Sequence, residues 1–152
     1  MELLNIPERL RLCPESVAKL CKVEMDSNMM GDILVALDWY IACRTNQVTS
    51  TKNDKSLSSS ASLEILSSKN FVYRWMRSLM DCGRFNLNID FLDTKQKNCA
   101  SSLLRYLLAG DLYHHCDATA NSQSGQTFIY GEEHIQKLGQ VYKIPGWRNT
   151  LP

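Results

Sequence analysis

The most chemically reactive side chains of this 152-residue chain gather at His114-His115-Cys116-Asp117. Imidazole and thiolate are ligands that zinc prefers, and a thiolate next to an imidazole is also a possible nucleophile. Neighbouring residues on a helix point about 100° apart, so these four side chains do not converge on one ion. No second cluster completes a tetrahedral set, unless His134 or Cys82 folds over it. A polar helix end is the simplest interpretation. A small thiol- or metal-dependent enzyme that uses the His114-His115-Cys116 region is the alternative.

The cysteines as a set follow the apolar pattern of the chain. None forms a Cys-x-x-Cys pair, and no spacing matches a zinc site. Reduced, mostly buried thiols fit this pattern best. The glycine-rich phosphate-binding motifs and the nucleophile motifs are also missing from the sequence. We therefore predict a protein that is not an enzyme and holds no cofactor and no metal. The six cysteines stand at positions 13, 21, 43, 82, 99 and 116.

Charge and hydropathy narrow the class of partner. The 17 basic and 16 acidic residues leave a net charge of +1, too little to build a sustained positive field. We therefore expect neither nucleic acid nor a membrane surface as the main partner. The first residues show no basic region followed by an apolar run, and no apolar stretch approaches about 18–20 residues. These features favour a cytoplasmic protein.

The elements that organise the chain lie between Phe71 and Leu108. Phe71 and Trp75 begin one apolar helical face, and Leu103 and Leu107 belong to a second. We expect these four residues in the core. Gly83 is expected to end the first helix, because glycine tolerates the left-handed conformation that closes helices. Asp93-Thr94 and Gly110 are expected to start and end the second helix.

A Gly-Arg-Phe elbow joins these two helices. Phe85 follows Arg84 there, and an apolar run that includes Leu87 and Phe91 comes next. Arg74, Arg77 and Arg84 form a small basic patch, which is either a solvated helix face or a contact to an acidic residue or chain terminus of a partner. Because two paired amphipathic helices carry no catalytic groups on their surface, we expect this unit to hold another protein.

The rest of the chain also shows helical patterns and no alternating strand pattern. Helices are expected from Pro14, behind Asp26-Ser27-Asn28 and from Glu132. We predict an all-α fold: a single domain over 1–152, built as a compact helical bundle or short right-handed superhelix of about five to seven helices. The polar, Ser- and Thr-rich composition predicts flexible loops and a loose tail. These segments are 44–62, 117–127 and 146–152.

Two stretches resemble a known family. The sequence CGRFNLNIDFLD at 82–93, followed by LLRYLL, resembles the C-terminal helical domain of the RNA polymerase II-associated protein 3 family. The stretch NMMGDILVALDWYI at 28–41 is similar to the first strong helix of that family. The resemblance covers roughly Leu10 to Leu108, and it looks closest to the coiled-coil-domain dynein-arm assembly factor and to sperm-associated antigen 1. The chain departs from the family in its longer 44–62 loop and in lacking an aromatic-rich first helix.

The resemblance implies a non-enzymatic adaptor in chaperone-assisted complex assembly, most specifically in the assembly or attachment of axonemal dynein arms. It implies RuvB-like AAA+ ATPases and dynein-arm components as partners, and a place in the cytoplasm, cilium or flagellum. Carried onto this sequence, it makes Arg84 and Phe85 contact residues of the elbow, with Leu87 and Phe91 as core. A structural protein that associates with itself, through Trp39, Trp147 or the methionine-rich helix start, is a further alternative.

Overall fold

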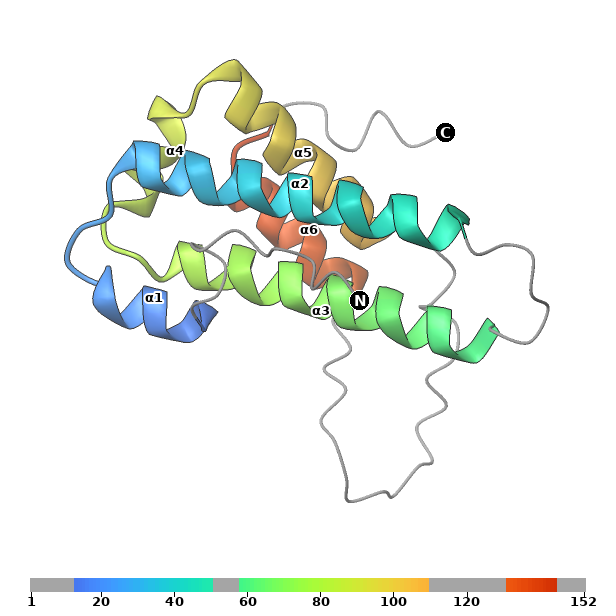
Figure 1. Ribbon diagram of the computed structural model, residues 1–152. Helices are drawn as coiled ribbons and strands as arrows, with labels where there is room; N and C mark the ends of the chain where they lie inside the picture. The colour runs from blue at the N-terminus through green and yellow to red at the C-terminus, as the bar shows by residue number, and fades with distance from the viewer. Residues whose placement is uncertain (1–12, 51–57, 110–130, 145–152) are drawn as a thin grey trace.

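The computed structural model describes residues 13–50, 58–109 and 131–144. These residues form six helices and no strand, which confirms the predicted all-α class (Figure 1). No helix among them is long and apolar enough to cross a bilayer. The helices are α1 (Pro14–Leu20), α2 (Ser27–Ser50), α3 (Ser58–Met80), α4 (Phe85–Phe91), α5 (Thr94–Leu108) and α6 (Glu132–Val141).

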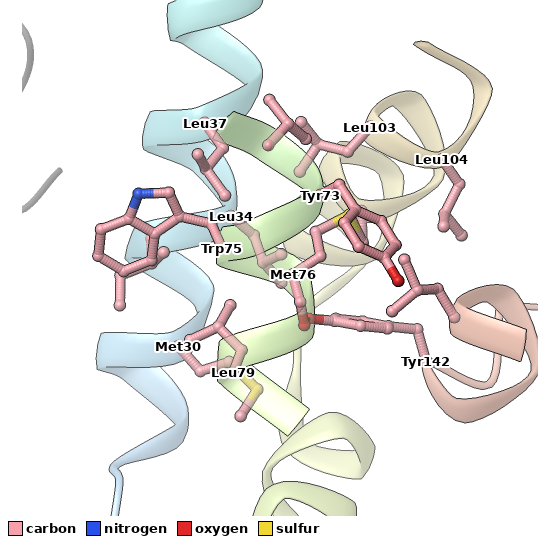
Figure 2. Packing of buried hydrophobic residues seen from close by; sticks show 14 of the residues in the cluster. Met30, Leu34, Leu37, Tyr73, Trp75, Met76, Leu79, Leu103, Leu104 and Tyr142 are labelled. Atoms are coloured by element: carbon pink, nitrogen blue, oxygen red, sulfur yellow. The ribbon is translucent and has the colours of Figure 1, made fainter. Parts of the chain in front are cut away.

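Helix α3 is the centre of the fold, because it contacts α1, α2, α5 and α6. Trp75, Met76 and Leu79 of α3 are fully buried. Figure 2 shows Met76 between side chains of α2 and of α5, with Tyr142, just after the end of α6, closing the same core. An amphipathic helix gains most of its stability from such packing rather than from its own backbone bonds. The bundle is therefore built around α3.

Three of the four expected core residues of the central stretch are fully buried: Trp75, Leu103 and Leu107. The fourth, Phe71, is partly buried, and its ring lies 5.1 Å from that of Tyr40 and 6.4 Å from that of Trp75. Aromatic pairs at these separations add to the stability gained by burial alone. The two helical faces read from the sequence thus meet in one core.

Asp93 starts α5 as expected. Its Oδ1 accepts a hydrogen bond from the Gln96 backbone N–H at 2.7 Å, and Gln96 Oε1 accepts from the Asp93 backbone N–H at 3.0 Å. This reciprocal capping box satisfies two donors that an uncapped helix leaves without partners. The expected end at Gly110 lies outside the described residues; α5 ends at Leu108.

The predicted loop over 44–62 is wrong over most of its length. Helix α2 continues to Ser50 and α3 already begins at Ser58. Extending an existing helix costs far less than starting one, so weakly helical residues can follow a strongly helical stretch. Within α2 the Thr45 hydroxyl donates to the Ile41 carbonyl at 2.9 Å and so finds a partner inside the helix. Segments 51–57, 117–127 and 146–152 lie outside the described residues, and the single-domain prediction stays a prediction.

The expected burial of Leu87 and Phe91 is also wrong. Both side chains are exposed, at 50% and 68% of their surface. The apolar run after the elbow forms the short helix α4, so the helical period decides which side chains face inward. Ile89 is buried, whereas Leu87 and Phe91, four residues apart, share the opposite face.

Candidate partner-binding surface

The elbow, residues 82–85, is in close backbone contact with the connector between α1 and α2, residues 21–26. The Gly83 backbone N–H donates to the Cys21 carbonyl at 2.8 Å. A Cβ atom at position 83 would lie 2.3 Å from the Val23 carbonyl oxygen and 2.6 Å from that of Lys22. Glycine is needed here for this close approach. The left-handed residue is Arg84, at φ 59° and ψ 21°, which corrects the expected reason for the glycine.

Two side chains hold the connector against the elbow and α4. Arg84 Nη1 lies 2.8 Å from the Glu24 carboxylate at the surface. Below this ion pair, the buried Asn88 side chain donates through Nδ2 to the Met25 carbonyl at 2.5 Å. Burying an amide without a partner costs free energy, so Asn88 fixes the connector more firmly than the exposed ion pair does.

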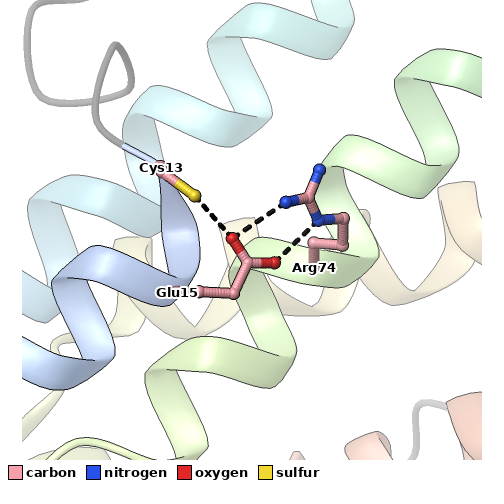
Figure 3. A network of polar contacts seen from close by, with 3 residues as sticks. All are labelled: Cys13, Glu15 and Arg74. Carbon is pink, nitrogen blue, oxygen red and sulfur yellow. Dashed lines mark hydrogen bonds and ion pairs between the residues drawn. The ribbon is translucent and has the colours of Figure 1, made fainter.

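Arg74 makes a second link between α3 and α1. Its Nε and Nη2 donate to the two carboxylate oxygens of Glu15, each at 2.8 Å (Figure 3). The Cys13 thiol donates to the same carboxylate at 2.7 Å. The hydrogen bond from Arg74, with a smaller contribution from Cys13, lowers the pKa of Glu15 from its ordinary value of 4.5 to about 2. Like Arg84, Arg74 is thus engaged within the chain.

The Glu15 ion pair predicts a small pH-dependent contribution to stability. A carboxyl group with a lowered folded-state pKa stabilises the fold above its unfolded value of 4.5, and this contribution is lost as the pH falls toward 2. Both side chains are about half exposed, so Glu15→Gln should lower the free energy of unfolding by less than about 1 kcal/mol at pH 7. Urea unfolding between pH 7 and pH 2 measures the effect, with Glu64→Gln as the exposed control. The prediction is wrong if the difference in unfolding free energy between the parent and Glu15→Gln does not shrink below pH 4.5.

Phe85, expected to contact a partner, lies in the core instead. Its side chain is 5% exposed, and its ring meets the Tyr142 ring edge-on at 5.1 Å. Phe85 therefore positions the elbow from within. Arg77, the remaining member of the basic patch, is exposed on α3.

The exposed apolar side chains near the elbow were not predicted as a surface. Leu20 and Val23, at the end of α1 and in the connector, are 78% and 87% exposed. Leu87 and Phe91 stand on the outer face of α4. Figure 1 shows the end of α1, the connector and α4 at the same end of the bundle. We call these four residues the elbow surface. No sequence pattern predicts this grouping, because it depends on the Gly83–Cys21 backbone contact between segments far apart in the sequence.

A comparison with protein-family models matches residues 8–97 to the family described as the potential Monad-binding region of RPAP3. The match covers more than half of the chain. The chain belongs to this family. No curated protein and no solved structure matches it in the corresponding searches. Because the family is a protein-binding region rather than a catalytic one, the chain carries a protein-interaction module.

All four residues of the elbow surface lie within the RPAP3 family region. The region ends at residue 97, in the first turn of α5, so it includes α1, α2, α3 and α4. Helix α6 and most of α5 lie beyond it but supply buried core residues such as Leu103 and Ile135. The family region thus presents the surface, and the segments after it complete the core that supports that surface.

Most residues of the other candidate sites lie outside the described part of the chain. His114, His115, Cys116 and Trp147 lie outside the described residues, so the thiol or metal alternative stays untested. Among the residues that the structure does describe, no group of three or more His, Cys, Asp or Glu side chains could hold a metal ion. Trp39 lies on α2 with about half of its surface exposed.

Proposed function

We propose that this chain is a helical adaptor that binds a protein partner through the elbow surface. One observation carries the proposal: Leu87 and Phe91 lie side by side on an outward face of α4, at the end of the bundle where Leu20 and Val23 are also exposed. Apolar side chains gathered in this way often mark interaction sites. The family description, which names a protein-binding region, supports the same function.

The family description also suggests which partner to test first. It names Monad as the potential partner of the RPAP3 region, and we propose a Monad-type protein as the partner of this chain. The function of this chain would then be to help assemble multiprotein complexes. The resemblance to dynein-arm assembly factors adds RuvB-like AAA+ ATPases and dynein-arm components as further partners in the cytoplasm or the cilium.

The basic side chains near this surface play a secondary part in the proposal. Arg84 is exposed but paired with Glu24, and Arg77 is exposed one helical turn beyond Arg74. Exposed charges at the rim of an interface change the association rate more than the affinity, whereas buried apolar anchors supply most of the binding energy. Leu87 and Phe91 are therefore the residues whose replacement should matter most.

The proposal predicts that the double variant Leu87→Ser/Phe91→Ser loses at least about tenfold in affinity for the partner, since burying one such side chain contributes about 1.5–3 kcal/mol. Calorimetry of the purified chain with a purified Monad-type protein measures this affinity. The stability of the double variant should stay close to that of the parent, because both side chains are already exposed.

Trp39→Ser is the matched control, because it also removes a partly exposed apolar side chain but lies near the middle of α2, a helix that contributes no residue to the elbow surface. It should bind the partner as the parent does. Unchanged affinity of a folded double variant would reject the elbow surface as the binding site. A parent whose mass rises with concentration, with Trp39→Ser staying monomeric, would instead favour self-association through Trp39.

A further inference from the structure

The backbone brings two cysteines together at the elbow. The Gly83 N–H bonds to the Cys21 carbonyl at 2.8 Å. Cys82 directly precedes the donor, and Cys21 carries the acceptor. With standard backbone dimensions, a hydrogen bond of this length holds the Cα atoms of residues 21 and 82 within about 6 Å of each other. Disulfides in proteins span Cα separations of about 4.4–6.8 Å, so the backbone places these two positions within bridging distance.

The two thiols differ in how accessible they are to solvent. Cys82 is 5% exposed, and its thiol donates weakly to the Ser78 carbonyl at 3.5 Å. Burial, with smaller contributions from the nearby Cys21 and Asp81, raises the pKa of Cys82 to about 11. Cys21 is partly exposed, so it is the thiol that a reagent reaches first.

We propose that Cys21 and Cys82 form a reversible intramolecular disulfide by exchange with a small disulfide such as oxidised glutathione. The Cys21 thiol gives its proton to solvent, and its sulfur attacks one sulfur of the reagent, whose S–S bond breaks and releases the first glutathione thiolate. The Cys82 sulfur then loses its proton and attacks the Cys21 sulfur of the mixed disulfide, which releases the second glutathione. Two protein thiols are oxidised to one disulfide, and one reagent disulfide is reduced to two thiols.

The disulfide would hold the connector covalently against the elbow, in addition to the weaker contacts that already join them. At present one backbone hydrogen bond, the Asn88 side chain and the exposed Arg84–Glu24 pair keep these segments together. A covalent bridge between residues 21 and 82 closes a long loop of the chain, which restricts the unfolded state. The oxidised protein should therefore unfold at a higher urea concentration than the reduced one. This inference does not depend on which partner the elbow surface binds.

The test uses the full chain, incubated with oxidised glutathione at pH 8 and analysed by intact mass under non-reducing conditions. The expected product is monomeric and has lost about two mass units, the two thiol hydrogens. After alkylation and trypsin digestion, the fragment 20–22 should be found joined to the fragment 78–84, and dithiothreitol should separate them. Because the thiolate is the attacking form, closure should be faster at pH 9 than at pH 7.

The single variants distinguish this pair from the other cysteines. Cys21→Ser and Cys82→Ala should each keep glutathione as a mixed disulfide or stay unmodified, without the loss of two hydrogens. Cys43→Ser, which removes a thiol on α2, should oxidise as the parent does. Cross-linked fragments that join other cysteines, or only mixed disulfides in the parent, would overturn the proposal. The main measurement is the intact mass and cross-linked fragments of the parent chain, so the test still holds if a variant fails to fold.

Discussion

Gly83→Ala should lower the free energy of unfolding by about 2–4 kcal/mol, because the added methyl group has no room. The new Cβ would lie 2.3 Å from the Val23 carbonyl oxygen and 2.5 Å from its carbonyl carbon. Both atoms belong to backbone that the Gly83–Cys21 hydrogen bond and Asn88 hold in place. Either the connector moves and those bonds break, or the clash stays. Equilibrium unfolding in urea, followed by circular dichroism, measures the loss.

Two other glycines serve as controls for this result. A Cβ at Gly131, before α6, meets its nearest atoms at 3.7 Å, an ordinary contact, so Gly131→Ala should cost less than about 1 kcal/mol. A Cβ at Gly31 would lie 2.0 Å from the end of the Gln96 side chain, which can move away at the cost of its one capping-box hydrogen bond to the Asp93 N–H. Alanine is also the better helix former at position 31, by about 1 kcal/mol. If all three variants lose equal stability, the backbone contact at Gly83 is not the cause of the loss in Gly83→Ala.

The helices with a continuous apolar face could be predicted from the sequence. The faces that include Trp75 and Leu103 are fixed by residue spacing alone, and both are buried in the core. Asp93 could be predicted as the start of α5, because a cap depends on residues only three positions apart. Local rules of this kind work where neighbouring residues decide the structure.

The candidate site could be predicted only in part, because contacts between distant segments build it. Arg74 and Arg84 form an obvious basic patch in the sequence, but their partners Glu15 and Glu24 lie 59 and 60 positions away. The sequence indicates Gly83 as a helix end but not the close approach of the Val23 carbonyl, because the connector lies far from Gly83 in the sequence. The short helix α4 reverses the expected burial of Leu87 for the same reason: packing against the connector decides which of its faces is inside.

Substitutions at Tyr142 can show whether α6, which lies beyond the family region, is a necessary part of the core. Its side chain is 2% exposed, and its hydroxyl donates to the Met76 carbonyl of α3 at 2.8 Å. The ring also packs edge-on against Phe85, the buried residue of the elbow. One side chain thus joins α6 to both the central helix and the segment that carries the elbow surface.

Tyr142→Ala should therefore cost about 3–5 kcal/mol of unfolding free energy, the range for removing a large buried aromatic side chain. Tyr142→Phe is the matched control: it keeps the ring and loses only the hydrogen bond, so about 1 kcal/mol is expected. Urea unfolding measures both values, and hydrogen exchange of α6 amides shows whether the helix detaches first. The total free energy of unfolding of a folded protein is commonly only about 5–15 kcal/mol, so the alanine variant should lose a large part of its stability. If Tyr142→Ala is instead as stable as the parent, the 8–97 region holds its own core, and α6 is an addition to it.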